Sequence, residues 1–154
     1  MSRRLVLALA VSGAAFAAAP LSVTLQDPSN GNSVTLQSGA RALHVVFFAT
    51  WCEPCRAELV RLDDLEARYG ERGYRLVLVG VPTRQSAERL RQFAATEHPP
   101  GLLLYDAAGE ASTALHPDGL PTHVLLDAAG AEVHRSAALD AATITAVETL
   151  VRRH

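Results

Sequence analysis

The stretch ATWCEPCRAE, residues 49–58, contains both cysteines of this chain. Cys52 and Cys55 stand three positions apart, behind a tryptophan and around a Glu-Pro pair. The apolar run ALHVVFFA at 42–49 leads into them and has the length and continuity of a strand buried on both faces. Two cysteines this close can close a ring, bind a metal ion or exchange electrons, and the rest of the chain has to decide among these roles.

A helix is predicted directly after the first cysteine, from Pro54 to Tyr69, because leucines and Tyr69 recur on one of its faces. Pro54 suits a first turn, since the N–H that it lacks would have no helical partner there. Cys52 then stands where unpaired N–H groups and the positive end of the helix dipole favour a thiolate. Cys55 lies one turn further in, so we expect it to be the more buried partner of a small disulfide ring.

The rest of the chain alternates strands with helices. Two short alternating runs within 21–37 flank Asn30-Gly31 and predict a β-hairpin near the N-terminus. Further downstream we expect strands at 74–81, 101–106, 122–127 and 131–137 and helices at 84–98 and 140–153. This order is typical of an α/β fold with helices on both faces of the sheet.

Composition describes a single globular domain. The chain has 154 residues, of which 49% are hydrophobic, and a formal net charge of −2. It contains no long basic run, so we expect no nucleic-acid partner.

The N-terminus predicts export. Residues 1–18 combine two arginines, an apolar run and an Ala-x-Ala pattern at 15–17, as in a secretory signal peptide. We therefore expect a signal peptide over 1–18 and a mature domain over 19–154 that works in the periplasm or elsewhere outside the cytoplasm, where disulfides persist. Retention of the segment as a membrane anchor is the alternative, although the run is shorter than the ~20 residues that span a bilayer.

Three roles compete with redox chemistry for the cysteine pair. A zinc site needs about four ligands, and the chain has two cysteines with no suitably spaced histidine pair. A purely structural disulfide across so short a loop would contribute roughly 2 kcal/mol. A copper site is better supplied, because Cys52, Cys55 and His123 together offer two soft thiolates and an imidazole.

Two motifs resemble one family. FFATWCEPCRAE at 47–58 and GLPTHVLLDAAG at 119–130 are similar to the cysteine and proline motifs of secreted thioredoxin-like proteins of the TlpA and ResA type. The resemblance covers roughly residues 20–154. It implies a thioredoxin fold, with a central mixed β-sheet flanked by helices and an N-terminal β-hairpin, and it implies a thiol-disulfide oxidoreductase.

The resemblance also implies catalytic roles. Cys52 would be the nucleophile and Cys55 the resolving thiol. Pro121 would be a cis-proline facing the disulfide, and the backbone of Leu120 would pair with an extended substrate chain. Glu58 matches an acidic residue close to the thiols in ResA-type proteins, and we expect it to relay protons and, if partly buried beside sulfur, to have a raised pKa.

The residues around the two motifs complete the candidate site. Trp51, Glu53, Pro54 and Thr122 are expected to contact substrate. Where many thioredoxins bury an acid, this chain has Val46, which leaves Glu58 as the proton relay.

Two histidines lie in or near the proline motif. His123 stands where family members often have a small or apolar residue; it could tune the thiolate, bind metal or only fill a strand. His116, in a loop near the proline, is interpreted as a surface residue.

The predicted function is reduction of disulfides in secreted proteins. A carboxylate at Glu53 opposes thiolate formation at Cys52 and so makes the couple less oxidising, although Arg56 partly cancels it. The expected partners are secreted disulfide substrates, with cytochrome c maturation and oxidase copper-site assembly among the candidate pathways, and an upstream membrane thiol reductant.

No cofactor or metal is expected beyond the redox-active disulfide, and the chain is expected to be a monomer. The alternatives are a copper-binding chaperone that uses Cys52, Cys55 and His123, and a thiol peroxidase. The peroxidase is disfavoured because the chain has no Pro-x₃-Thr-x₂-Cys pattern.

Overall fold

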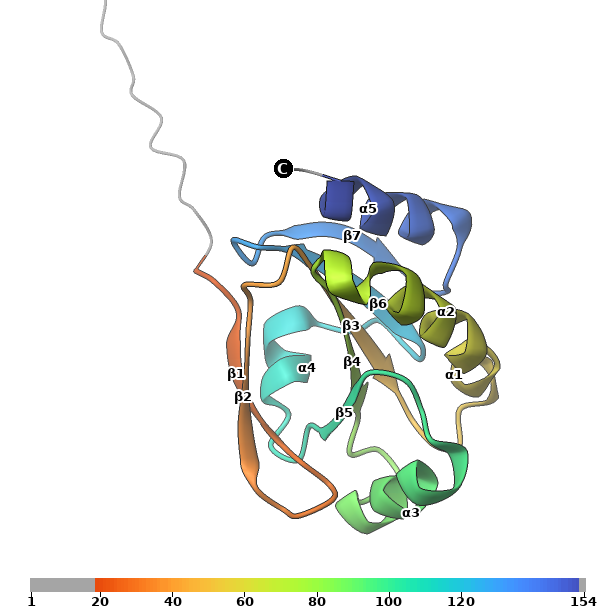
Figure 1. Cartoon of the computed structure of the whole chain (residues 1–154). Helices are drawn as coiled ribbons and strands as arrows, with labels where there is room; N and C mark the ends of the chain where they lie inside the picture. The colour runs from red at the N-terminus through yellow and green to blue at the C-terminus, as the bar shows by residue number, and fades with distance from the viewer. Residues whose placement is uncertain (1–18, 153–154) are drawn as a thin grey trace, which may run out of the picture.

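The computed structural model describes residues 19–152, which form a seven-stranded mixed sheet with helices on both faces (Figure 1). The strands are β1 (Ser22–Gln26), β2 (Ser33–Gln37), β3 (Ala42–Phe48), β4 (Tyr74–Gly80), β5 (Leu102–Tyr105), β6 (Thr122–Asp127) and β7 (Glu132–Ser136). The helices are α1 (Glu53–Ala57), α2 (Leu59–Tyr69), the 3₁₀ turn η1 (Gly70–Arg72), α3 (Ala87–Glu97), α4 (Glu110–Leu115) and α5 (Ala141–Arg152). The predicted thioredoxin-type α/β fold is confirmed.

The strand order β2-β1-β5-β4-β3-β6-β7 places β3, the strand that leads to the cysteines, inside the sheet. It pairs in parallel with β4 and antiparallel with β6, and all seven of its residues are buried. Six of its seven side chains are apolar, the exception being His44, and this composition suits a strand covered on both faces. The two motifs are therefore adjacent in space, because β3 ends at the first and β6 begins in the second.

The predicted N-terminal hairpin is confirmed. Its two strands have the same sequence, SVTLQ, and pair antiparallel with Thr24 opposite Thr35. The connection is longer than a two-residue turn: the Asp27 carbonyl accepts the Gly31 N–H, and the Asp27 N–H bonds the Asn32 carbonyl. Gly31 has φ +78°, a value that favours glycine.

The single helix predicted from Pro54 to Tyr69 is divided into α1 and α2 at Glu58. The Glu58 N–H bonds the carbonyls of Arg56 and Cys55, a tighter pattern than that of an α-helix, and its φ and ψ are −91° and −13°. The division leaves the Glu58 side chain at a junction, where it contacts two distant segments described below.

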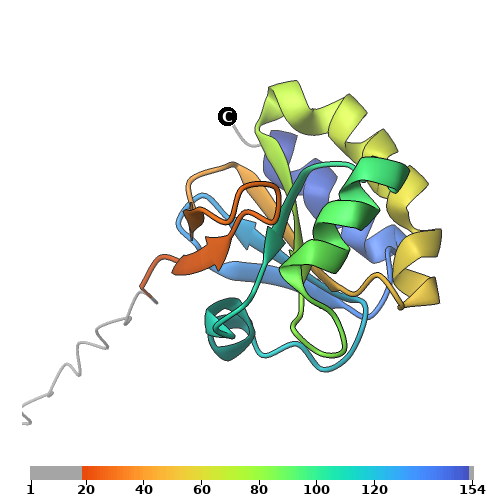
Figure 2. The same cartoon turned by 90° about the horizontal axis from the view of Figure 1, so that it is seen from below.

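One helix was not predicted. Figures 1 and 2 show α2, α3 and α5 on one face of the sheet and α4 on the other. The start of α4 is held by the buried carboxylate of Asp106, which accepts the N–H groups of Ala111 and Ser112 at 3.0 and 2.9 Å. At six residues, α4 is too short for its periodicity to be visible in the sequence.

The predicted signal peptide, residues 1–18, lies outside the described residues. Within 19–152, none of the helices combines the length and apolar character required to cross a bilayer.

Candidate active site

Cys52 and Cys55 form a disulfide at the start of α1, with their Cα atoms 5.3 Å apart. Cys52 is the N-cap residue, and its sulfur accepts the Cys55 backbone N–H at 3.3 Å. That contact is one of the interactions that favour negative charge on a sulfur at this position. The two residues are similarly buried, at 5% and 3% exposure, so the expected difference in burial is small.

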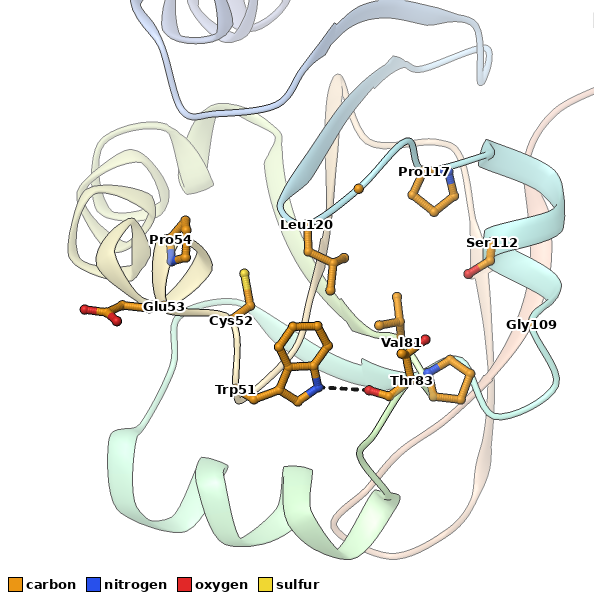
Figure 3. A pocket seen from close by; sticks show the side chains of 12 residues that line it. Trp51, Cys52, Glu53, Pro54, Val81, Thr83, Gly109, Ser112, Pro117 and Leu120 are labelled. Atoms are coloured by element: carbon orange, nitrogen blue, oxygen red, sulfur yellow. Dashed lines mark hydrogen bonds between the residues drawn. The ribbon is translucent and has the colours of Figure 1, made fainter.

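The two sulfurs differ in what lies in front of them. Cys52 lines a groove of about 760 Å³, and Cys55 does not. Figure 3 shows the side chains of Trp51, Cys52 and Leu120 around the same space. The other lining residues are Glu53, Pro54, Val81, Pro82, Thr83, Gly109, Ser112, Pro117 and Gly119. The lining is mainly apolar, which suits a peptide segment with an apolar side chain.

Trp51 forms one wall of the groove, although 39% of it is exposed. Its indole Nε1–H donates to the Thr83 carbonyl at 2.9 Å, and the guanidinium of Arg84 lies 4.2 Å from the ring centroid (Figure 3 shows the hydrogen bond). The Gln85 side chain ties the same loop to the cysteine segment, since its Oε1 accepts the Thr50 N–H and its Nε2 donates to the Val81 carbonyl. The aromatic wall is thus held in place before a substrate arrives.

The proline loop forms the opposite wall. The bond between Leu120 and Pro121 is cis, as predicted. The Leu120 side chain lies in the groove, whereas Pro121 is buried. Thr122 is also buried, and its hydroxyl donates to the Gly119 carbonyl at 2.7 Å, so it shapes the loop from inside. Glu53 and Pro54 are exposed at the rim, and the Glu53 carboxylate points out of the groove (Figure 3).

Glu58, between α1 and α2, is partly buried and does not line the groove. Its Oε1 accepts the Leu139 backbone N–H at 2.7 Å, and its Oε2 is 2.8 Å from His123 Nε2. Burial acts to raise the pKa of Glu58, but the hydrogen bonds from His123 and Leu139 outweigh it and lower the pKa. The expectation of a raised pKa is therefore wrong, because the carboxylate has two donors that were not visible in the sequence.

His123 is a buried polar residue with both ring nitrogens near other side chains. It is 1% exposed, and while Nε2 faces Glu58, its Nδ1 lies 3.0 Å from His44 Nε2. Both nitrogens are thus engaged by protein groups. Residues 19–152 contain no group of three or more His, Cys, Asp and Glu side chains arranged to hold a metal ion. The copper ligand set of Cys52, Cys55 and His123 is not assembled here.

Sequence reasoning missed two kinds of site residue. The first is the far wall of the groove, from the loop after β4 and from α4, which carries no motif. The second is His44 with Tyr74, which lie in strands predicted as apolar and form hydrogen bonds behind Glu58. Polar residues inside an otherwise apolar strand were the available signal, since buried polar groups need partners. His116 is exposed, as interpreted from the sequence, at the end of α4.

Two sequence comparisons identify relatives of this chain. The Redoxin family model matches residues 14–150. The thiol-disulfide oxidoreductase ResA from Oceanobacillus iheyensis is 49% identical over 35 residues, which are 23% of this chain and 18% of that protein.

Solved structures agree in fold. StoA from Bacillus subtilis superposes with a TM-score of 0.69 at 20% identity, over 85% of this chain and 98% of StoA. The exposed lipoprotein thioredoxin Etrx1 from Streptococcus pneumoniae gives 0.70 at 20% identity, over 84% of this chain and 99% of that one. The chain belongs to the Redoxin family and has the fold of thioredoxin-like thiol-disulfide oxidoreductases.

Proposed function

We propose that this chain is an extracytoplasmic thiol-disulfide oxidoreductase that reduces disulfides in other proteins. The observation that carries the proposal is the Cys52–Cys55 disulfide, whose first sulfur opens onto an apolar groove while the second does not. Family membership and the 35-residue match to ResA support the same chemistry.

The reaction moves two electrons and passes through one covalent intermediate. In the reduced protein, the Cys52 thiolate attacks a sulfur of the substrate disulfide, forms a mixed disulfide and releases one substrate thiolate. Cys55 then gives up its proton and attacks the Cys52 sulfur, which forms the Cys52–Cys55 disulfide and releases the second substrate thiolate. The Cys55 proton passes to Glu58, three residues further along the chain, and an external dithiol re-reduces the protein.

The substrate lies in the groove between Trp51 and Leu120. Its backbone pairs with the Leu120 backbone as an added strand, and an apolar side chain beside its cysteine fills the space between Val81 and Leu120. Pro121 faces the disulfide from the loop. Proteins that expose an extended, apolar segment around a disulfide are the substrate class that this lining favours.

Two observations support work as a reductant. The Glu53 carboxylate adjoins Cys52 in the chain and has no cationic partner among the ion pairs of residues 19–152. Arg56, which could have offset it, pairs instead with Glu97 of α3 at 3.4 Å. Less stabilisation of the Cys52 thiolate makes the couple less oxidising.

Export is supported by the signal-like residues 1–18 and by the likeness to an exposed lipoprotein thioredoxin. In that compartment the substrates are secreted proteins, cytochrome c precursors or copper-site assembly proteins among them, and electrons come from a membrane thiol reductant. The protein acts as a monomer, with the cysteine pair as its redox centre. N-terminal sequencing of envelope material tests export; a chain that still starts at Met1 in the cytoplasm contradicts it.

Insulin reduction in the presence of dithiothreitol tests the activity. The wild-type protein should accelerate precipitation of the insulin B chain, and Cys52→Ser should not. Hydrogen peroxide consumption, measured in parallel with the same reductant, separates this function from a thiol peroxidase. Peroxide turnover without insulin reduction would overturn the proposal.

A further inference from the structure

Four polar side chains form a continuous hydrogen-bonded line that ends at Glu58, between α1 and α2. Tyr74 Oη lies 2.8 Å from His44 Nδ1, His44 Nε2 lies 3.0 Å from His123 Nδ1, and His123 Nε2 lies 2.8 Å from Glu58 Oε2. The three inner members come from β4, β3 and β6 and are 0–1% exposed. The line thus connects the sheet interior to the junction beside the cysteines.

The protonation state of Glu58, at one end of the line, determines which nitrogen of each histidine carries a proton. When Glu58 is a carboxylate it can only accept, so His123 must carry its proton on Nε2. His123 Nδ1 is then an acceptor, which requires a proton on His44 Nε2. His44 Nδ1 is in turn an acceptor, and it receives the Tyr74 hydroxyl proton. With one proton on each imidazole, every bond in this arrangement runs toward Glu58.

The same four groups also fit the opposite arrangement. A protonated Glu58 donates to His123 Nε2, which moves the His123 proton to Nδ1. His44 Nε2 then accepts, its proton sits on Nδ1, and that proton points at the Tyr74 oxygen. The line therefore holds one extra proton on Glu58 without leaving any of these interior nitrogens unpaired. The buried side-chain nitrogen and oxygen atoms of residues 19–152 all have a partner in the structure.

We propose that Tyr74, His44 and His123 form a reversible hydrogen-bond chain that accommodates Glu58 in both protonation states, and that they are positioning residues for the proton transfer between Glu58 and Cys55. The inference rests on the proposed function, in which Glu58 takes the Cys55 proton when the disulfide forms and returns it on reduction. Reversal of the hydrogen bonds keeps every imidazole nitrogen of His44 and His123 paired in both states, while Tyr74 Oη changes from donor to acceptor.

The surroundings of His44 and Tyr74 favour the neutral form of each. Burial, with His123 and His134 nearby, lowers the pKa of His44 to about 3. Burial, with Glu66 of α2 nearby, raises the pKa of Tyr74. Arg61 of α2 acts together with His123 to favour the carboxylate form of Glu58. An extra proton is therefore disfavoured on His44.

Glu58→Gln provides a direct test, because Leu139 fixes the orientation of the new amide. The Leu139 N–H donates to Oε1, so the amide oxygen takes that place and its NH₂ faces His123 Nε2. The amide then imitates protonated Glu58. Nitrogen-15 NMR at neutral pH should show both histidines protonated on Nε2 in the wild type and both on Nδ1 in Glu58→Gln. His134, which bonds Thr143, should be unchanged in both and is the internal control.

His44→Leu tests the connection to the reaction. Without His44, protonation of Glu58 leaves the Nδ1–H of His123 buried and without a hydrogen-bond partner. Such unpaired buried N–H groups are rare. Resolution of the mixed disulfide by Cys55 should become at least about threefold slower (0.65 kcal/mol by the relation of rate to barrier), with KM for insulin unchanged. Thr143→Val, which removes the partner of His134 instead, should resolve at the wild-type rate.

Three results overturn the inference: a wild-type chain with either histidine protonated on Nδ1 or on both nitrogens, identical tautomers in wild type and Glu58→Gln, or normal resolution in His44→Leu. The wild-type spectrum needs no variant, so it decides even if Glu58→Gln fails to fold. Insulin reduction by the same wild-type sample reports separately on the proposed function. If the protein reduces insulin but its histidine tautomers do not change in Glu58→Gln, the hydrogen-bond chain is rejected and the proposed function stands. If the tautomers change but insulin is not reduced, the proposed function is rejected and the hydrogen-bond chain stands.

Discussion

The surroundings of Cys52 and of Glu58 differ in polarity. In front of Cys52 lies an open, mainly apolar groove, formed by loops and the short helix α4. Behind α1, Glu58 is joined to two buried histidines and a tyrosine from the central strands. The groove has the character needed to receive a peptide, and the polar line has the character needed to hold protons. Under the proposed function, the groove would serve binding and the polar line would serve proton transfer, so the two tasks would fall to different parts of the same fold.

Loss of either sulfur should have the largest effect. Cys52→Ser should lower insulin reduction by at least about 10³-fold, since the covalent route is lost. Cys55→Ser should retain the first attack and accumulate a mixed disulfide with substrate, visible on a non-reducing gel. Mixed disulfides that form through Cys55 in Cys52→Ser, and not in Cys55→Ser, would reverse the assignment of the two roles.

The second-largest expected effect is a loss of stability when the buried hydrogen-bond line is broken. His44→Leu leaves the Tyr74 hydroxyl and His123 Nδ1 without partners and should lower the free energy of unfolding by about 2–4 kcal/mol. Tyr74→Phe, which leaves only His44 Nδ1 unpaired, should cost about 1–2 kcal/mol. The double variant should cost less than the sum, because the two residues share one bond.

Urea denaturation of the four proteins measures this coupling. Strictly additive losses would show that the hydrogen bond between His44 and Tyr74 contributes nothing of its own. Val60→Ala, at a position that is 74% exposed, is the control and should change stability by less than about 0.5 kcal/mol.

Acid should lower the free energy of unfolding through His44 and Glu58 of the same hydrogen-bond line. The folded-state pKa of His44, about 3, lies below the ~6.5 of an unfolded histidine. The stability that neutral His44 contributes is therefore complete above pH ~6.5 and is lost as the pH falls toward 3. The lowered pKa of Glu58 acts in the same direction below about 4.3. The free energy of unfolding should fall by roughly 1.4 kcal/mol per pH unit for each such group. Urea midpoints between pH 7 and 5 should drop in wild type and stay nearly level in His44→Leu; parallel curves would contradict the assignment.

Changes on the groove side should have the smallest effect and should appear in binding. Leu120→Ala removes an apolar contact for substrate and should raise KM for insulin about three- to tenfold, equivalent to about 1 kcal/mol of apolar contact. The rate of mixed-disulfide resolution should not change, since Cys55 and Glu58 remain. A variant with normal KM and slow resolution would mean that the two sides of the disulfide are not functionally separate.

The two faces of the sheet were predictable from sequence to different degrees. Helices α2, α3 and α5 were all predicted from the sequence. The predictions for α3 and α5 are confirmed within a few residues, whereas the helix predicted over 54–69 is divided into α1 and α2. Helix α4 covers the other face and was missed, because its six residues show less than two helical turns and its start depends on the Asp106 carboxylate. The wall of the groove that α4 provides was missed with it.

The sequence alone determined the fold class, the cysteine pair, the proline loop and its cis bond, because these depend on local patterns and on motifs that resemble a family. Only the tertiary structure decided what surrounds Glu58. His44, Tyr74, His123 and Leu139 come from four separate segments, and β3, β4 and β6 bring three of them together by their pairing. The pKa of Glu58 is lowered and not raised for that reason: hydrogen bonds from distant segments outweigh burial, and no local pattern encodes such partners.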